Sequence, residues 1–332
     1  MKNQALILGT GSYLPEKILS NSDLEKLVET SDEWIVSRTG MKERRIAEKE
    51  EHASYMGAQA AQKAIEASGL RKEDIQCIIF TSSAPDYIFP SSGSLAQAYL
   101  GLFEIPAFDC SAACTGYLYG LSVAKAYIES GSYDNVLLIA ADKLSSFVNY
   151  QDRNTCVLFG DGASACVISR KKTEDIVGSE IVQICLGTDG HLAGLLSLPA
   201  GGSRIPATAD TVKQGLHFIS MEGKEVFKHA VRRMEHASKK CLEDAHLSED
   251  DLDWLVPHQA NARIIDAIAK RFKISDDRVF KTVHKYGNTA SSSVGIALDE
   301  LLKQDLVHTN DHILLVAFGG GLSWGAAILR RL

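Results

Sequence analysis

The chain has 332 residues, of which 45% are hydrophobic and 23% are charged, and its formal net charge is −7 at pH 7. This composition is typical of a globular protein with a substantial core, and the negative charge argues against a general nucleic-acid binder. The N-terminal apolar run is too short for a signal peptide and no apolar stretch reaches membrane-spanning length, so we expect a cytoplasmic protein without a membrane partner. The 7 cysteines lack CxxC spacing, which indicates neither a disulfide framework nor a zinc site.

The sequence contains an internal repeat, whose first copy has a helix, an acidic turn and a buried strand at residues 64–79. The same pattern recurs 177 residues later at 241–256, and at the same shift the buried strand 134–140 matches 311–317. Buried strands alternate with amphipathic helices in both copies, which favours mixed α/β layers with helices flanking the sheets. A polar linker at 169–175 then places the boundary near residue 172, between halves 1–172 and 173–332.

Within the first half, a short apolar run leads through small residues to Cys114 and then to a helical pattern. The helix is predicted to be central and buried, with an apolar stripe of Leu118, Leu121, Ala124 and Ile128. Cys114 should therefore lie at a helix N-terminus, where unpaired amides and the helix dipole favour a thiolate. We expect its pKa to fall from about 8.5 toward roughly 3.5 to 7.5, which would make it a nucleophile for thioesters.

In the second half, a strand over 254–257 delivers His258 to its end, and a helical pattern follows. Ligands gather at the ends of strands in α/β layers. Asn288 lies in a polar turn that precedes an apolar helix predicted over 294–302. Its side-chain amide, a hydrogen-bond donor, is therefore expected near another helix N-terminus.

The repeat register explains how these distant residues could converge. Cys114 lies over Ser291, just after Asn288, so the two halves would present equivalent helix N-termini toward one site. Three glycines at 319–321 follow a buried strand and would let a backbone N–H approach a substrate oxygen. Together with His258 these groups offer a nucleophile, a polarising imidazole and amide donors, which is the set needed for acyl transfer through a thioester.

Taken singly, each of these segments also fits a structural role. A buried structural cysteine, a structural or surface histidine, a helix-capping asparagine and a tight glycine turn would give the same local patterns.

Six motifs in one order resemble the β-ketoacyl-acyl-carrier-protein synthase III family of the thiolase-like superfamily, over essentially the whole chain. They are TSDEWIVSRTG at 30–40, AACTG at 112–116, FGDGA at 159–163, VPHQAN at 256–261, YGNT at 286–289 and FGGG at 318–321. The resemblance implies a duplicated thiolase-like α/β fold, layered α-β-α-β-α, with mixed five-stranded sheets around central buried helices.

The resemblance also implies a two-step reaction without a metal or redox cofactor. Cys114 would take an acetyl group from acetyl-CoA, with the oxyanion held by the backbone N–H groups of Cys114 and Gly320. Malonyl-acyl-carrier-protein would then lose CO2, and donors from His258 and Asn288 would stabilise the enolate beside an apolar wall at Phe318. The carbanion would attack the acetyl thioester to give acetoacetyl-acyl-carrier-protein, starting fatty acid synthesis.

Further positions follow from the same resemblance. Trp34 and Arg153 would sandwich the adenine of CoA, with Thr30 and Arg38 nearby. Residues expected to line the pantetheine tunnel are Asn261 and Arg263. Residues expected to meet phosphates of CoA or an acidic carrier protein are Lys228, Lys270 and Arg271.

The family is homodimeric, and Phe89 matches the residue that reaches into the partner's acyl pocket, where a bulky ring fits a short starter. Thr115 and Tyr117 stand where smaller or less polar residues are common in the family, and Cys110 and Ser111 precede the nucleophile. These differences concern the polarity of the pocket and the preferred acyl chain.

Rival functions have distinct sequence requirements. A thiolase should carry a second catalytic cysteine in its C-terminal glycine region, and 317–325 contains none. A papain-type hydrolase has a different signature around its nucleophile and is not built from a duplicated half. The alternatives that stay open are a related condensing enzyme with another starter or acceptor, such as a hydroxymethylglutaryl-CoA synthase, and a non-catalytic partner subunit.

Overall fold

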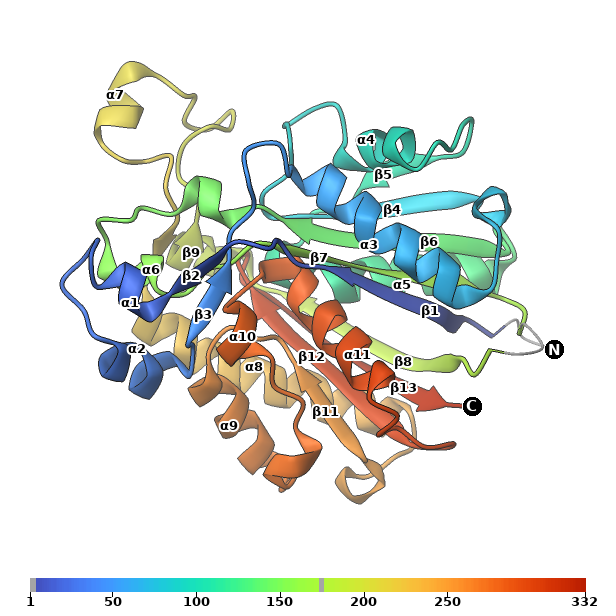
Figure 1. The fold of residues 1–332 in the computed structure, drawn as a ribbon. Coiled ribbons are helices and arrows are strands. Elements are labelled where there is room, and N and C mark those ends of the chain that lie inside the picture. The colour runs from blue at the N-terminus through green and yellow to red at the C-terminus, as the bar shows by residue number, and fades with distance from the viewer. Residues whose placement is uncertain (1–3, 173–175) are drawn as a thin grey trace.

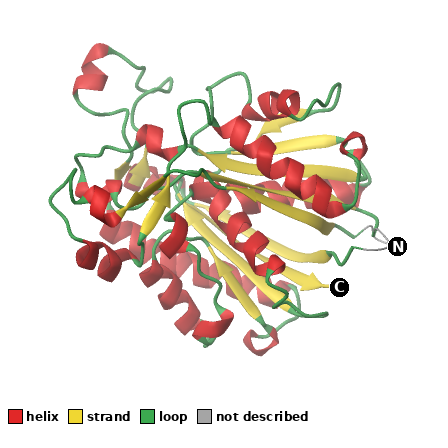
Figure 2. Cartoon of the chain, in the orientation of Figure 1, coloured by secondary structure: helices red, strands yellow, loops and turns green. Residues whose placement is uncertain are grey.

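A computed structural model describes residues 4–172 and 176–332 of the chain. Helices and strands alternate along it, and the longer helices pack on both faces of an extended sheet (Figures 1 and 2). The boundary predicted near residue 172 adjoins residues 173–175, which lie outside the described residues. Within the described ranges, no helix is both long and apolar enough to cross a membrane.

The strands are β1 (Leu6–Tyr13), β2 (Ile18–Ser20), β3 (Glu43–Arg45), β4 (Cys77–Thr81), β5 (Ala107–Asp109), β6 (Asn135–Asp142), β7 (Gly162–Ser169), β8 (Ser179–Thr188), β9 (Leu196–Ser197), β10 (Ser220–Met221), β11 (Trp254–Pro257), β12 (His312–Gly319) and β13 (Ser323–Arg331). The α-helices are α1 (Asn21–Leu24), α2 (Asp32–Thr39), α3 (Ala53–Ser68), α4 (Ser92–Tyr99), α5 (Gly116–Ser130), α6 (Arg153–Cys156), α7 (Ala209–Lys213), α8 (Gly223–Asp244), α9 (Ala262–Arg271), α10 (Val283–Tyr286) and α11 (Ser293–Lys303). Short 3₁₀ turns precede α5 and α11, at Ala113–Thr115 and Ala290–Ser292.

The main sheet has the strand order β11-β12-β13-β8-β1-β7-β6-β4-β5. The segment β5-β4-β6-β7-β1 mixes parallel and antiparallel pairs, as does the segment β11-β12-β13-β8. The two segments join through β1 and β8, where Leu6 pairs with Glu180 and Ile7 with Ser179. The sheets of the two halves are therefore continuous through a short antiparallel contact.

Helices α5 and α11 form the central layer. Helix α5 contacts β4 and β6 on one side and β8 and β13 on the other, and α11 likewise contacts β1 and β7 as well as β11 and β12. The predicted apolar stripe of α5 is fully buried. Helix α3 covers β1, β6 and β7 on one outer face, whereas α8 covers β8, β12 and β13 on the other. This is the predicted α-β-α-β-α layering.

The C-terminal half departs from the expected five strands. Within the described residues its part of the main sheet has four strands, β8, β11, β12 and β13, and the fifth position is reduced to a single parallel bridge between Leu255 and Val279. The side chain of Gln259 explains the early end of this pairing. Its Oε1 accepts hydrogen bonds from the backbone N–H groups of Thr282 and Val283 at 2.8 and 3.0 Å, so a side chain takes over donors that a strand would have used.

The repeat shift of 177 residues reappears in the coordinates. The turn Ala113–Thr115 before α5 corresponds at this shift to Ala290–Ser292 before α11. Ala113 and Ala290 even share a left-handed backbone, with φ of 46° and 45°. Both halves thus carry the same sharp turn at the N-terminus of a central helix, and the two turns contact each other.

Candidate active site

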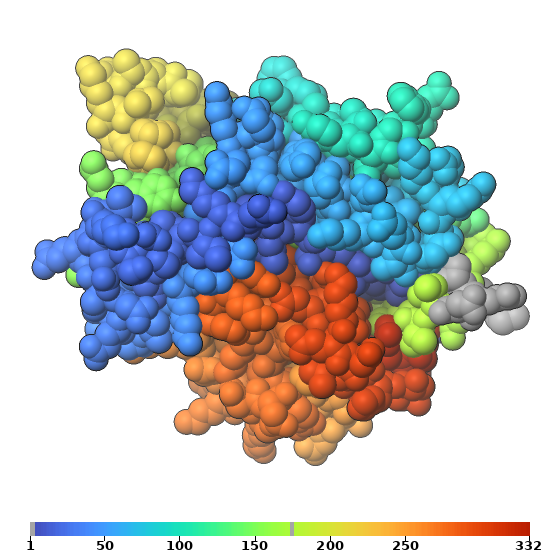
Figure 3. Space-filling model, in the orientation of Figure 1, coloured from blue at the N-terminus to red at the C-terminus, as the bar shows by residue number. Residues whose placement is uncertain are grey.

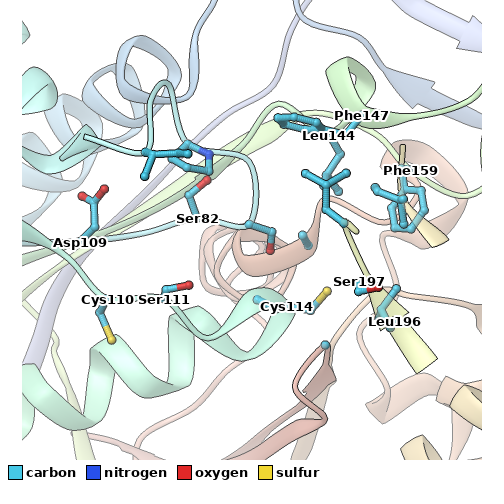
Figure 4. Close-up of a pocket in the computed structure, with 18 of the residues that line it drawn as sticks. Ser82, Asp109, Cys110, Ser111, Cys114, Leu144, Phe147, Phe159, Leu196 and Ser197 are labelled. Carbon is cyan, nitrogen blue, oxygen red and sulfur yellow. The ribbon is translucent and has the colours of Figure 1, made fainter. Parts of the chain in front are cut away.

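Two cavities meet at Cys114. The larger, of about 450 Å³, is lined on one side by Ser82 and on the other by Leu144, Phe147 and Leu196 (Figure 4), and Ser83 also lines it. The smaller, of about 210 Å³, is lined among others by Trp34, His258, Asn288 and Phe318. Because Cys114 lines both, a group attached to its sulfur could extend into one cavity while a second reactant arrives through the other.

Cys114 occupies the middle of its 3₁₀ turn, directly before α5, as predicted. A Cβ built on Gly319 would lie 2.8 Å from both the Cβ and the backbone N of Cys114, so only glycine allows β12 to approach the nucleophile this closely. The backbone amides of Cys114 and Gly320 act as hydrogen-bond donors that lower the pKa of the cysteine. These are the two N–H groups assigned to the oxyanion, and that assignment stays a prediction.

The predicted lowering of the Cys114 pKa is wrong for the protein without substrate. Burial, the largest cause, and the nearby Asp142 carboxylate together raise the pKa of this thiol to about 12, although the two amide donors act in the opposite direction. Cys114 is 7% exposed, and its loss of hydration favours the uncharged form. The resting group is a thiol.

His258 stands at the end of β11, 3% exposed, and burial lowers its pKa to about 4. Its Nδ1 lies 2.5 Å from the hydroxyl oxygen of Ser293. That oxygen also accepts the backbone N–H of Gln259 at 3.4 Å, and among the described residues Nδ1 is the one acceptor found for the serine proton. The lowered pKa favours a neutral imidazole, and donation from Ser293 to Nδ1 favours the tautomer with its proton on Nε2.

Asn288 is fixed through its backbone by the FGDGA segment. Its N–H donates to the Leu158 carbonyl at 2.8 Å, and its carbonyl accepts the N–H of Gly160 at 3.0 Å. Its side-chain oxygen accepts the N–H of Ala290 at 2.9 Å. Because that oxygen is occupied, the Nδ2 amide is the group Asn288 can offer to a ligand in the smaller cavity that it lines.

The other predicted residues around the nucleophile divide between the cavities. Phe318 is 4% exposed and lines the smaller cavity, whereas Gly320 lines the larger. Phe89 lines neither and is 84% exposed, beside Tyr87 and Ile88, which do line the larger cavity. Its predicted place is in a partner's pocket, and that stays a prediction.

The expected adenine clamp is closed in this structure. The Arg153 guanidinium lies 4.7 Å from the centre of the Trp34 ring, so the two flat groups contact each other and would have to separate to admit a base. Arg38 lies 5.9 Å from the same ring. Trp34, Arg38 and Asn261 all line the smaller cavity, and Asn261 donates to the Arg38 carbonyl. Thr30 is partly buried, and its hydroxyl has no hydrogen-bond partner within the described residues.

The predicted basic residues lie outside the cavity. Arg263 differs from the expectation, because it is exposed on the first turn of α9 and does not line the tunnel. Lys228 pairs with Glu225 at 2.6 Å and Arg271 with Glu235 at 3.5 Å, while Lys270 is exposed on α9. Lys228 directly follows Phe227, which lines the smaller cavity, so this cation lies next to the cavity lining.

Sequence reasoning missed several polar groups behind the site. Ser293 sets the His258 tautomer, and Asp142 ties the Asn288 turn to the wall of the larger cavity. Its carboxylate accepts hydrogen bonds from the backbone N–H groups of Ser83 and Ser291. Ser291 is the repeat counterpart of Cys114, which was the one signal in the sequence that pointed to this contact.

Geometry and fold together define a thiolase-like condensing acyltransferase, with a cysteine nucleophile between two cavities. The comparisons with known proteins narrow this class. Residues 108–190 match the family model described as 3-oxoacyl-[acyl-carrier-protein (ACP)] synthase III, and residues 242–331 match the model of its C-terminal part.

Relatives match over nearly the whole chain. The β-ketoacyl-[acyl-carrier-protein] synthase III of Chlamydia caviae is 70% identical over 328 residues, covering 99% of this chain and 97% of the relative. The enzyme of the same name from Caldanaerobacter subterraneus is 50% identical, covering 99% and 98%. The crystal structure of 3-oxoacyl-[acyl-carrier-protein] synthase III from Aquifex aeolicus superposes with a TM-score of 0.89 at 45% identity, covering 98% and 99%. The chain belongs to the β-ketoacyl-[acyl-carrier-protein] synthase III family, the acyltransferases that start fatty acid synthesis.

Proposed function

We propose that the chain condenses acetyl-CoA with malonyl-acyl-carrier-protein through an acyl-Cys114 intermediate, releasing CoA and CO2 and giving acetoacetyl-acyl-carrier-protein. The observation that carries the proposal is that Cys114 lines both cavities, whereas His258 and Asn288 line only the smaller one. The acyl group can then rest in the larger cavity while the smaller serves successively for CoA and the malonyl thioester. This arrangement fits a ping-pong reaction.

In the first half-reaction, the sulfur of Cys114 attacks the thioester carbonyl and the C–S bond to CoA breaks. The thiol proton ends on the sulfur of the departing CoA, so no other acceptor is needed in the balance. The amides of Cys114 and Gly320 donate to the oxyanion, and losing one such donor typically costs about a hundredfold or more in rate.

In the second half-reaction, the C–C bond to the malonyl carboxylate breaks and its electrons move onto the thioester oxygen. Nε2–H of His258 and Nδ2–H of Asn288 would donate to that enolate oxygen. Phe318 presents an apolar wall that disfavours the carboxylate relative to neutral CO2. The enolate carbon then attacks the acetyl carbonyl and the C–S bond to Cys114 breaks. The sulfur leaves as a thiolate and takes up one proton from water, which regenerates the thiol.

The partners follow from the same proposal. An acidic carrier protein would meet the exposed cations Lys228, Arg263, Lys270 and Arg271 around the tunnel mouth. A homodimer would cover the exposed Phe89 and bring it to the partner's acyl cavity. The chemistry assigned to these residues requires no metal, and the cytoplasm, where acyl-CoA and the carrier protein meet, is the expected compartment.

The test is intact-protein mass spectrometry after incubation with a mixture of acyl-CoAs, followed by a chase with malonyl-acyl-carrier-protein. We expect one acetyl adduct that is absent from Cys114→Ala and is converted by the chase to acetoacetyl-acyl-carrier-protein. An adduct that the chase leaves in place would point to a different acceptor. A protein that takes no acyl group from any acyl-CoA would overturn the proposal.

A further inference from the structure

A pair of buried hydroxyls lies directly behind the nucleophile. Oγ1 of Thr115 and Oγ of Ser323 are 2.8 Å apart, and the two residues are 0% and 3% exposed. Thr115 follows Cys114 in the chain, whereas Ser323 is the first residue of β13, immediately after the glycine loop. The pair therefore joins the two segments that carry the oxyanion donors.

Both hydroxyls also reach backbone carbonyls of these segments. Thr115 Oγ1 donates to the Ala112 carbonyl at 2.6 Å. Ser323 Oγ lies 2.9 Å from the Gly320 carbonyl and 3.3 Å from that of Ala112. Each hydroxyl has a single proton, so with Thr115 donating to Ala112 the Ser323 proton is shared between Thr115 Oγ1 and the Gly320 carbonyl. The contacts still connect the Cys114 turn to the Gly320 loop.

We propose that Thr115 and Ser323 are positioning residues that hold the backbone N–H groups of Cys114 and Gly320 in the geometry of the oxyanion hole. This inference rests on the proposed acyl-transfer function. It concerns the first half-reaction directly, because that step requires both amides to point at one oxygen atom.

Pairing of Gly319 with Ser323 and backbone hydrogen bonds between Leu322 and Asp189 hold the two ends of the glycine loop, and the hydroxyl pair acts on the residues between them. Ala113, which precedes Cys114, has a left-handed backbone with φ of 46°, a conformation that non-glycine residues adopt only when neighbouring contacts enforce it. The Gly320 side consists of glycines, which have no side chains to pack. Hydroxyl contacts to the carbonyls of Ala112 and Gly320 supply that constraint from behind, at a distance from the substrate.

A small displacement of the donors is enough to matter. Misplacing a reacting group by about 1 Å can cost on the order of a hundredfold in rate, and deleting one oxyanion donor costs about a hundred- to a thousandfold. Loosening a donor without deleting it should cost less. We therefore expect loss of the Thr115 hydroxyl to slow acylation about tenfold.

The experiment compares Thr115→Val, which keeps the shape and removes the hydroxyl, with Thr115→Ser, which keeps the hydroxyl. Ser130→Ala, an exposed position on the same helix, is the matched control. Acylation of Cys114 by acetyl-CoA is followed by rapid quench and intact-protein mass spectrometry, with the dependence on acetyl-CoA concentration measured for each variant. Thermal unfolding of each variant is recorded alongside.

We expect Thr115→Val to lower the maximal acylation rate about tenfold with the half-saturating acetyl-CoA concentration unchanged, and Thr115→Ser to restore most of the rate. Equal rates for Thr115→Val and wild type would overturn the inference. Equal losses in the Val and Ser variants would also overturn it, because the variant that keeps the hydroxyl would then be no better than the variant that lacks it.

A second variant covers the case in which Thr115→Val does not fold. Ser323→Ala removes the other hydroxyl and should slow the same step by a similar factor, and an unchanged rate would refute the pairing. If the wild type itself takes no acetyl group, the proposed function falls and this inference with it. A normally acylated wild type with unaffected Val and Ala variants removes only the inference.

Discussion

Replacing Ser293 by alanine tests the role assigned to the His258 tautomer. Ser293 is 1% exposed at the start of α11, and its hydroxyl is 2.5 Å from Nδ1 of His258. In Ser293→Ala this nitrogen loses its donor in a buried place. The ring must then either keep Nδ1 unsatisfied or move its proton from Nε2 to Nδ1, which removes the donor that faces the enolate.

The size of the effect follows from the buried acceptor. An unsatisfied buried polar group costs about 1–3 kcal/mol, and each 1.36 kcal/mol corresponds to a factor of ten in rate. If the whole cost falls on the Nε2–H tautomer, decarboxylation should slow about 5- to 150-fold. Acylation of Cys114 should change little, since its oxyanion is held by backbone amides.

The assay separates the two half-reactions. Release of CO2 from labelled malonyl-acyl-carrier-protein reports the second, and the acetyl adduct on the intact protein reports the first. Ser292→Ala is the matched control, because Ser292 is equally buried on the same turn but its hydroxyl donates to the Thr289 carbonyl at 2.8 Å.

A Ser293→Ala protein that releases CO2 at the wild-type rate would refute the tautomer argument. So would a variant in which both half-reactions fall together with an unchanged ratio, since this would indicate a general disturbance of the site. An effect of the same size in Ser292→Ala would lead to the same conclusion.

Three further predictions concern other parts of the site. Gly319→Ala should slow acylation about a hundredfold or more in the quenched-flow assay, because the added Cβ would lie 2.8 Å from the Cys114 backbone N; a rate near that of wild type would show that β12 can give way. Trp34→Ala should raise KM for acetyl-CoA about 2- to 30-fold with little change in kcat, if the indole stacked with Arg153 binds the base; an unchanged KM in steady-state kinetics would exclude this. Because burial lowers the pKa of His258 to about 4, the unfolded chain binds the extra proton between about pH 6.5 and 4, so this residue's contribution to stability is full above that window and is lost as pH falls through it. The free energy of unfolding, measured in urea at pH 7 and 4.5, should therefore fall more for wild type than for His258→Asn. Equal falls in the two proteins would contradict the predicted direction of the pH dependence.

Much of the fold could be predicted because the duplication repeats the same local signals. The buried strands at 77–81 and 254–257 and the central helix after Cys114 all appear where apolar spacing indicated them. The absence of a fifth strand from the second half could not be predicted. It depends on the side chain of Gln259, which reaches backbone N–H groups more than 20 residues away. A distant side chain that takes the place of strand hydrogen bonds leaves no periodic pattern in the sequence.

Site residues could be predicted from the sequence where the side chain itself is reactive. Cysteine, histidine and asparagine at helix or strand ends announce a reactive group, and Cys114, His258 and Asn288 do line one cavity. Ser293 did not stand out, because a serine near a helix start is usually a cap. Thr115 was noted only for the polarity of the pocket, and nothing in the sequence paired it with Ser323 at the start of β13. Their significance comes from partners that only the fold brings near.

The pKa of Cys114 also could not be predicted from the sequence, because it depends on the surroundings of the thiol in the fold. The sequence indicated a helix N-terminus, which favours a thiolate, and a buried helix after Cys114, but not that the thiol itself is buried, and this burial raises its pKa. The same loss of hydration raises the pKa of the Cys114 thiol and lowers that of the His258 imidazole, so both groups rest uncharged. A preformed thiolate–imidazolium pair, on which papain-type hydrolases rely, is therefore disfavoured. Negative charge instead develops during reaction, on the oxyanion beside two backbone amides and on the enolate beside His258 and Asn288. Fixed neutral donors suit that order of events, since they stabilise charge where it forms without holding a permanent ion pair.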